Sequence, residues 1–314
     1  MQEIASVKNL GLDVNTKSIS YNMLSDFAEF VDASENTVKS YLRGVKAFMD
    51  YLTLRCITHP TRKDVIAFRD DIKEDHKATT VQNYMVAVKL FFKWCDSRGL
   101  YPNIAENLKG AKITREHKKD YLTSNQVKKV LSTIDTTTTQ GKRDYAIVSL
   151  MVCTALRDTE VVNANIEDMR TLGNNTVLYI LGKGRDEKAE YVKIVPQVED
   201  AIRNYLTEIP AELKQGNQPL FTSLSNNSKG GRLTERSVSR ICKKALTAAG
   251  FDSDRLTAHS LRHTAVTLSL LGGMSLQEAQ QFARHANIST TQIYAHNLER
   301  MNNKCEETVA KAIF

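Results

Sequence analysis

In two stretches of the first hundred residues, apolar side chains recur every three or four positions, and this spacing constrains the fold most. One stretch covers residues 38–52 after Ser34, a residue type that caps helices, and the other covers residues 81–95 before Gly99. A period of about 3.6 residues places such positions on one face of a helix, whereas a half-buried strand alternates every second residue. The pattern predicts two amphipathic helices.

Two further helices are predicted in the same part of the chain. Thr61 and Asp64 have the spacing of a capping box, and apolar positions follow at Val65, Phe68 and Ile72. Residues 20–31 form the remaining predicted helix. We therefore expect an N-terminal four-helix domain over residues 1–105.

Helical periodicity fades over residues 106–120, where basic residues are interspersed with Gly110 and polar side chains. A chain of 314 residues suits two domains of ordinary size, so we interpret this segment as a linker. It is either a plain solvated connection or, with DNA as partner, a basic strap along the phosphate backbone.

Residues 121–314 predict a second domain that is mainly helical with a small β-sheet. Thr123 and Gln126 have capping-box spacing, and a long helix starts near Arg143. Further helical patterns cover residues 198–205, 237–249 and 261–271. β-Branched and aromatic residues gather at 176–181 and 191–195, on either side of Lys183. That segment predicts a hairpin with Lys183 near its turn.

Composition narrows the class of protein. Hydrophobic residues make up 41% and charged residues 25%, which is typical of a folded globular protein and not of a disordered chain. No apolar run approaches the roughly 20 residues that span a bilayer, and no signal peptide is recognisable, so we expect a cytoplasmic protein without a membrane partner. The net charge of +7 is compatible with nucleic-acid binding, and five scattered cysteines suggest no disulfide framework.

Six separated residues with ionisable side chains carry the functional signal. They are, in order, Arg157, Lys183, His259, Arg262, His285 and Tyr294, and Glu160 follows the first of them. Together they resemble the fingerprint of the tyrosine recombinase and phage integrase family: Arg, Lys, His-x-x-Arg, His, and a Tyr about nine residues later. The resemblance covers nearly the whole chain and is closest to compact Xer-type recombinases and small mobile-element integrases.

This resemblance implies an architecture and an activity. The fold would be a four-helix, SAM-like core-binding domain plus an α+β catalytic domain, which close around a DNA duplex. The activity would be site-specific recombination, in which strands are cleaved and rejoined through a 3′-phosphotyrosine within a tetrameric synapse of two sites. It would need no cofactor, metal ion or ATP, because the phosphotyrosine bond conserves the energy of the broken bond. We therefore expect cleavage in EDTA.

The residue types fit this chemistry. Cleavage of a phosphodiester places negative charge on the non-bridging oxygens, and the guanidinium groups of Arg157 and Arg262 match them with a planar fork of donors. The weakly acidic phenol of Tyr294 needs a base before it attacks phosphorus, and His259 is the candidate.

The resemblance assigns the remaining roles. Lys183 would donate a proton to the leaving 5′ oxygen, His285 would hydrogen-bond the phosphate, and Glu160 would orient the catalytic helix. Arg185 and Lys188 compete with Lys183 for the role of proton donor, because they lie in the same hairpin.

Each assignment has an ordinary structural alternative. Arg157 and Glu160 have the spacing of a common helix-end ion pair, and Tyr294 could be a core tyrosine. His259 and His263 have zinc-ligand spacing, but no carboxylate or cysteine nearby completes a set. We leave His263 out of catalysis, because it is not a core element of the fingerprint.

Three departures from the family pattern leave every catalytic group in place. Ala155 replaces the usual glycine before Leu-Arg, Asp158-Thr159 replace an apolar–Ser pair, and Ala283-Arg284 replace Leu-Gly before His285. Arg284 is expected to matter most, because glycine there permits a tight turn, whereas a bulky cation would alter the loop or contact DNA.

The end of the chain and the partners complete the prediction. Near-helical apolar spacing predicts a tail helix with an apolar face, formed by Leu298, Met301, Cys305, Val309 and Ile313. In the family such a tail inserts into the adjacent protomer of the tetramer; the alternative is packing within its own chain. The other implied partners are double-stranded DNA with a specific site and an accessory DNA-bending or directionality protein.

Two rival functions use the same fold or chemistry. A catalytically silent DNA-binding protein would have lost at least one of the six residues, and all six are present. A type IB topoisomerase would relax DNA as a monomer, and the Xer-like helical N-terminal half disfavours it. Integration, excision, inversion and resolution all share the predicted chemistry, and the DNA sequence recognised depends on side-chain placement and DNA deformability.

Overall fold

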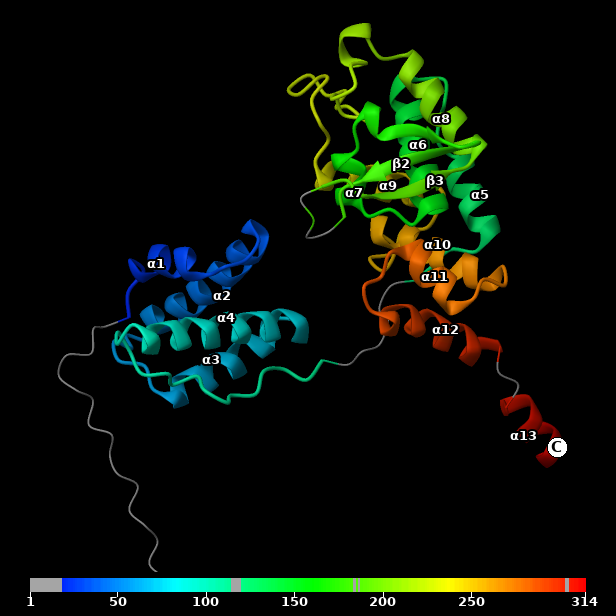
Figure 1. Ribbon diagram of the computed structural model, residues 1–314. Coiled ribbons are helices and arrows are strands. Elements are labelled where there is room, and N and C mark those ends of the chain that lie inside the picture. Colours follow the sequence, from blue (N-terminus) through cyan, green and yellow to red (C-terminus); the bar gives the residue numbers. More distant parts are fainter. Residues whose placement is uncertain (1–18, 114–119, 183–184, 186, 303–304) are drawn as a thin grey trace, which may run out of the picture. The chain divides into compact units, whose positions relative to one another are not determined.

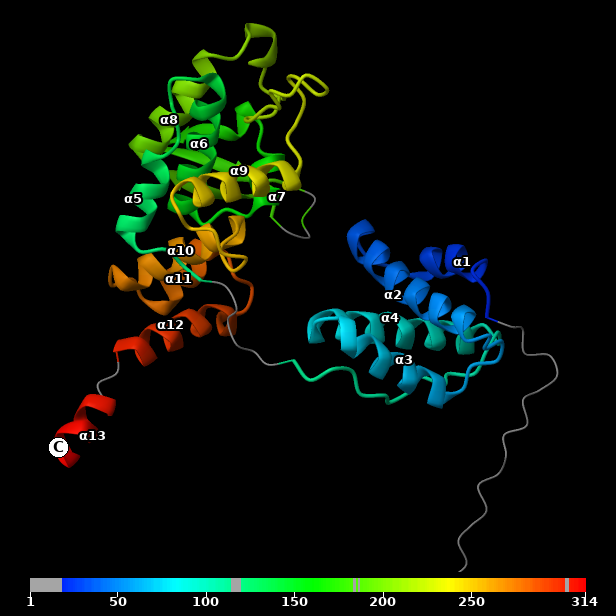
Figure 2. The ribbon, with the colours of Figure 1, turned by 180° about the vertical axis from the view of Figure 1, so that it is seen from behind.

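The computed structural model describes residues 19–113, 120–182, 185, 187–302 and 305–314. The chain divides into two compact units, residues 1–115 and 116–314, which are drawn in Figures 1 and 2. The division falls inside the segment 106–120 that we interpreted as a linker.

The first unit contains the four predicted helices. They are α1 (Met23–Phe30), α2 (Glu35–Leu54), α3 (Arg62–Asp75) and α4 (Ala78–Ser97). The predicted capping box opens α3, where the Thr61 backbone N–H donates to Asp64 Oδ2 over 2.7 Å. Helices α2 and α4 pack side by side (Figures 1 and 2), and Gly44 permits their close approach, since a Cβ there would lie 2.9 Å from that of Ala87.

Aromatic side chains fill the core of this unit. The ring of Phe48 meets those of Phe68 and Phe92 edge-on, with centroids 5.2 and 5.7 Å away. The same core buries Leu108, beyond the predicted domain boundary at residue 105. The first residues of the predicted linker therefore pack on the N-terminal unit.

The second unit is built mainly from helices. They are α5 (Ser124–Ser132), α6 (Thr139–Thr154), α7 (Asp158–Asn163), α8 (Pro196–Thr207), α9 (Glu235–Ala248), α10 (Ala258–Leu271), α11 (Leu276–Ala283), α12 (Ile288–Asn302) and α13 (Cys305–Ile313), with short 3₁₀ turns at Ile166–Asp168 and Ala211–Leu213. Helix α6 is central and packs against α8, α9, α10 and the sheet. It begins four residues before the predicted start, because the Thr138 hydroxyl caps it by accepting from the Gly141 N–H over 3.0 Å.

The sheet has three antiparallel strands in the order β1 (Met169–Leu172), β2 (Asn175–Ile180) and β3 (Glu190–Ile194). Strands β2 and β3 are the predicted hairpin, with Leu178 opposite Val192 in the register. Strand β1 was not predicted, because four residues are too few to show alternation. The sheet lies on one side of α6 (Figure 1), and α9 crosses on the side facing the viewer in Figure 2. No described helix is long and apolar enough to cross a membrane.

Candidate active site

The turn between α6 and α7 positions Arg157. Ala155, which stands where the family has glycine, adopts the left-handed conformation with φ +52°; for a residue with a Cβ this costs roughly 1–2 kcal/mol. After the turn, Glu160 Oε2 accepts from the Arg157 backbone N–H over 2.8 Å, and Glu160 Oε1 accepts from Arg157 Nη1 over 2.7 Å. The Glu160 side chain is 1% exposed and that of Arg157 26%, so a buried carboxylate orients a partly accessible guanidinium.

The turn between α11 and α12 carries another departure from the family pattern. Arg284 adopts the left-handed conformation itself, with φ +54°, so the tight turn forms without glycine. Its side chain folds back into the protein and is only 10% exposed. Arg284 Nη2 donates to Glu160 Oε2 and to the Ala155 carbonyl over 3.0 and 3.1 Å. The guanidinium therefore contacts the turn that precedes Arg157.

Arg262, on α10, lies between these two turns. Its side chain donates to the carbonyl of Ala155 through one terminal nitrogen and to the carbonyl of Ala283 through the other. The residue is 1% exposed. Burial, followed by the positive charges of Arg157 and Arg284, lowers the pKa of Arg262 to about 10. It remains a cation at neutral pH, so the site keeps a buried positive charge.

Tyr294, on α12, packs against the same turns. It belongs to a small buried cluster with Ala155 and Ala283, and the residue is 6% exposed. Its ring centroid lies 4.9 Å from that of His263 and 6.1 Å from that of His285. Burial raises the pKa of the phenol to about 12, although the nearby arginines oppose the shift. A nucleophilic Tyr294 therefore depends on a base that removes its proton.

Two histidines of α10 form a short chain of rings that reaches Tyr294. The rings of His259 and His263 meet edge-on with centroids 4.8 Å apart, and His263 contacts the tyrosine ring. His259 is exposed, whereas His263 is buried. No catalytic role was predicted for His263, although its four-residue spacing from His259 places both on one face of the helix.

His285 follows Arg284 and enters the site as a neutral ring. Its Nδ1 lies 2.9 Å from the hydroxyl oxygen of the buried Thr291 on α12. Burial, followed by the positive charges of Arg262, Arg157 and Arg284, lowers the pKa of His285 to about 4. At neutral pH the imidazole is therefore uncharged, and it can form hydrogen bonds.

This lowered pKa predicts a loss of stability in acid. The unfolded chain protonates His285 near its ordinary pKa of 6.5, whereas the folded protein holds the ring neutral down to about 4. The unfolded state binds more protons in this window, so the contribution of His285 to stability is present above pH 6.5 and is lost on acidification. We expect the free energy of unfolding in urea to fall more between pH 7 and pH 5 for the wild type than for His285→Asn. Equal losses in the two proteins would contradict His285 as the source of this pH dependence.

The hairpin borders the open side of the site. Lys183, the predicted proton donor, lies outside the described residues. Its two competitors are engaged elsewhere, since Arg185 pairs with Glu190 over 2.9 Å and Lys188 donates to Asp168. A hollow of the surface brings the end of the hairpin to both turns, and its lining includes Arg157, Gly182, Arg185, Gln280, Arg284 and His285.

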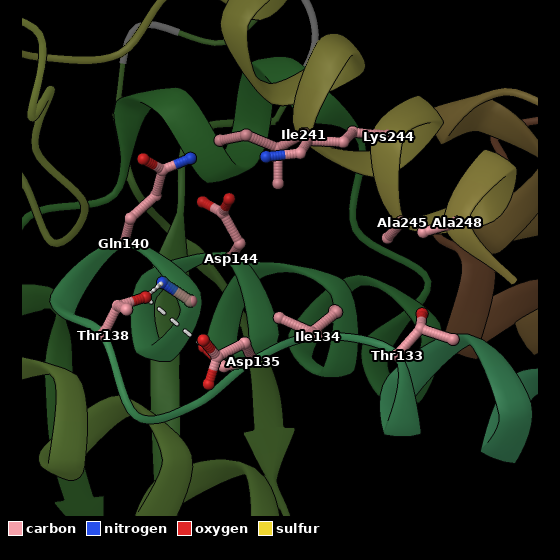
Figure 3. A pocket seen from close by; sticks show the side chains of 11 residues that line it. Thr133, Ile134, Asp135, Thr138, Gln140, Asp144, Ile241, Lys244, Ala245 and Ala248 are labelled. Atoms are coloured by element: carbon pink, nitrogen blue, oxygen red, sulfur yellow. Dashed lines mark hydrogen bonds between the residues drawn. The ribbon is translucent and has the colours of Figure 1, made fainter.

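Another pocket of this unit has a different character. Figure 3 shows it between the end of α5, the start of α6 and α9, with Asp135, Thr138 and Asp144 among its polar side chains. Thr138 caps α6, and Asp144 pairs with Arg143 over 2.7 Å, so these groups serve local structure. Of the described candidates for catalysis, Arg157 and His285 line the other hollow. Among the described residues, no group of three or more His, Cys, Asp or Glu side chains could hold a metal ion.

Comparisons with solved structures support the fold. XerH site-specific recombinase bound to palindromic difH substrate, in a post-cleavage complex, superposes with a TM-score of 0.72 at 21% identity, over 92% of this chain and 85% of that chain. A lambda integrase tetramer bound to a Holliday junction gives a TM-score of 0.66 at 16% identity, over 88% and 77%. The predicted combination of a helical N-terminal domain and an α+β catalytic domain is confirmed.

Sequence comparisons agree. Tyrosine recombinase XerD of Listeria monocytogenes is 27% identical over 285 residues, covering 88% of this chain and 94% of that protein. Tyrosine recombinase XerC of Corynebacterium glutamicum is 29% identical over 282 residues, covering 88% and 87%. A model of the phage integrase family matches residues 120–301, and a model of the phage integrase N-terminal SAM-like domain matches residues 26–99. The chain therefore belongs to the phage integrase family, the family of the tyrosine recombinases.

Proposed function

We propose that this protein is a site-specific DNA recombinase whose nucleophile is Tyr294. The observation that carries the proposal is that Arg262 on α10 donates hydrogen bonds to the α6–α7 turn and to the α11–α12 turn, next to Tyr294. The first turn positions Arg157 and the second positions His285. Fixed cations beside a phenol suit a reaction in which negative charge develops on a phosphate. Family membership supports the same reaction class.

Cleavage would follow from these contacts. The Tyr294 oxygen bonds the phosphorus while the bond from phosphorus to the 5′ oxygen breaks. The phenol proton passes to His259, the proposed base, whose ring contacts His263 beside the phenol. Arg157 and Arg262 stabilise the charge on the non-bridging oxygens.

Two further residues complete the cleavage step, and religation then restores the DNA backbone. Lys183 donates a proton to the leaving 5′ oxygen, and the neutral His285 hydrogen-bonds the phosphate that remains on Tyr294. The 5′ hydroxyl of another strand then attacks the phosphotyrosine and releases the phenol. The number of phosphoester bonds is unchanged, so neither ATP nor a metal ion is required.

A basic surface on α9 supports DNA as the partner. Arg236, Arg240 and Lys244 are exposed on this helix and line a shallow hollow with the partly buried Lys243. Acidic groups also reach it, since Asp158 and Glu235 are part of the lining. Lys243 pairs with Asp252, but the three exposed cations on this helix face can neutralise backbone phosphates and hold a duplex against the catalytic unit.

Trapping the covalent intermediate tests the proposal. Purified protein is incubated in EDTA with labelled duplexes from its genomic neighbourhood, each nicked so that cleavage releases a short fragment and prevents religation. We expect a protein–DNA adduct on denaturing gels, and its mapped position gives the target site. Retarded DNA on native gels without any adduct would favour a silent DNA-binding protein, and an adduct formed only without EDTA would contradict the metal-independent mechanism.

We further propose that four protomers assemble on two sites and that the tail acts in trans. Val309 and Ile313 of α13 are exposed, and no described residue of this helix is buried. An apolar helix face of this kind is stabilised when a neighbour covers it. A lambda integrase tetramer bound to a Holliday junction, whose fold is similar to that of this chain, supports the proposed tetramer. An accessory DNA-bending or directionality protein and a cytoplasmic, nucleoid-associated location complete the proposal.

Removing the tail is expected to separate DNA binding from synapsis. A chain ending at about residue 300 should retard a single-site duplex like the wild type, because α9 is intact, but form fewer tetrameric complexes of two duplexes on native gels. The variant Val309→Asp with Ile313→Asp keeps the chain length and places charges on exposed positions of α13, so it should show the same defect. Undiminished tetramers from both proteins would contradict a role in trans.

A further inference from the structure

Arg284 forms more contacts than the turn that contains it requires. Nη1 donates to the carbonyls of Phe282 and Thr154 over 3.0 and 3.3 Å, and Nη2 donates to Glu160 and to the Ala155 carbonyl. Three of these four acceptors belong to the segment from Thr154 to Glu160, which contains the α6–α7 turn, and not to its own turn. A buried arginine in this arrangement links two segments that are far apart in the sequence.

Glu160 is shared between two guanidinium groups. One carboxylate oxygen accepts from the Arg157 side chain, and the other accepts from the Arg157 backbone and from Arg284. The carboxylate is almost completely buried, so both of its oxygens depend on these donors. Two guanidinium groups around one carboxylate leave the cluster with a net positive charge, so Arg157 can still attract a phosphate.

The contacts of Arg284 also restrain the neighbouring His285. This residue directly follows Arg284, and its backbone N–H donates to the Gln280 carbonyl over 3.1 Å. When the Arg284 guanidinium is held by the α6–α7 turn, the start of the segment from His285 to Tyr294 is held at a set distance from Arg157. Small errors in such distances slow catalysis strongly.

We propose that Arg284 is a positioning residue for DNA cleavage, which locks the turn bearing His285 to the turn bearing Arg157 through Glu160 and the Ala155 carbonyl. This inference rests on the proposed recombinase function. It gives a role to a residue at a position where the family pattern has glycine, and glycine has no side chain with which to make this link.

Replacement by glycine is the sharpest test. Glycine adopts a positive φ readily, so Arg284→Gly keeps the turn and removes only the guanidinium. Using the nicked duplex mapped with the wild type, we expect single-turnover cleavage to slow roughly 10- to 100-fold with unchanged DNA affinity. Arg284→Lys keeps the charge and should recover part of the rate. The control Arg203→Gln, which alters an exposed arginine paired with Glu199, should cleave at the wild-type rate.

A double-mutant cycle tests the route through Glu160. If Arg284 acts through this carboxylate, Arg284→Gly should have little further effect on the cleavage rate or on the melting temperature of a Glu160→Gln protein. Additive effects on both would overturn the route. A wild-type cleavage rate in Arg284→Gly would overturn the proposal, and so would equal losses of affinity and rate together with a collapse of the melting temperature.

Failure of the proposed function is distinguishable from failure of this inference. If the wild type forms no adduct with any duplex, the recombinase function fails and the positioning role falls with it. In that case the melting temperatures of the same four proteins, which need no DNA, still decide whether Arg284 and Glu160 are energetically linked. If the wild type forms the adduct, the rates of its Arg284 variants decide the inference alone.

Discussion

Tyr294→Phe is expected to abolish the covalent protein–DNA adduct while leaving DNA binding unchanged. Phenylalanine keeps the ring that packs with Ala155 and Ala283 and lies near two histidine rings, but it lacks the attacking oxygen. Because the nucleophile is part of the intermediate, the loss should be complete and not partial. Denaturing gels of wild-type and variant protein with the nicked duplex measure it directly.

A second tyrosine provides the control for this experiment. Tyr145, on α6, lies outside the buried cluster and outside the hollow that Arg157 and His285 line, so Tyr145→Phe removes a phenol from the same unit away from the site. Its adduct should match that of the wild type in amount and position. An adduct formed by Tyr294→Phe would identify another nucleophile and would contradict the proposed mechanism.

The regular elements could be predicted from the sequence because each is encoded locally. The capping box at Thr123 and Gln126 forms as predicted, with the Thr123 backbone N–H donating to Gln126 Oε1 over 2.8 Å. The helix that precedes Gly99 ends where expected, and this glycine has φ +63°. Periodicity and capping residues lie within one element, so no knowledge of tertiary packing is needed to read them.

The candidate site could be predicted only as a set of residues. The order of the six residues indicates the chemistry, but the contacts among them depend on turns that bring distant segments together. Arg284 illustrates the difference: the sequence predicts a disturbed loop or a DNA contact, whereas the side chain turns inward to Glu160 and Ala155. A buried partner more than 100 residues away leaves no local pattern.

The two turns also show how this chain stabilises conformations that elsewhere call for glycine. Ala155 and Arg284 both have positive φ, and each turn is fastened by a side chain from another segment. Arg262 bonds the carbonyl of Ala155 and that of Ala283, next to Arg284. Hydrogen bonds from charged donors contribute about 1.5–3 kcal/mol each, enough to offset the cost of such a backbone.

Arg262→Lys is therefore expected to impair both catalysis and folding. A lysine supplies one point charge in place of two diverging donors, so it cannot bond the Ala155 and Ala283 carbonyls together as the fork does. The orphaned carbonyl should lower the free energy of unfolding by about 1–3 kcal/mol. The misplaced cation should slow cleavage on the order of 100- to 1000-fold. Urea unfolding and single-turnover cleavage measure the two effects.

Arg157→Lys is the matched comparison, because Arg157 has a similar role but a different environment. Its side chain is partly exposed and is held by Glu160, to which a lysine can still donate, so the free energy of unfolding should change little. The cleavage rate of Arg157→Lys should nevertheless fall, since the planar fork of donors that matches a phosphate is lost. Equal stability losses in the two variants would contradict the bridging role of Arg262. A wild-type cleavage rate in Arg262→Lys would show that Arg262 has no role in cleavage.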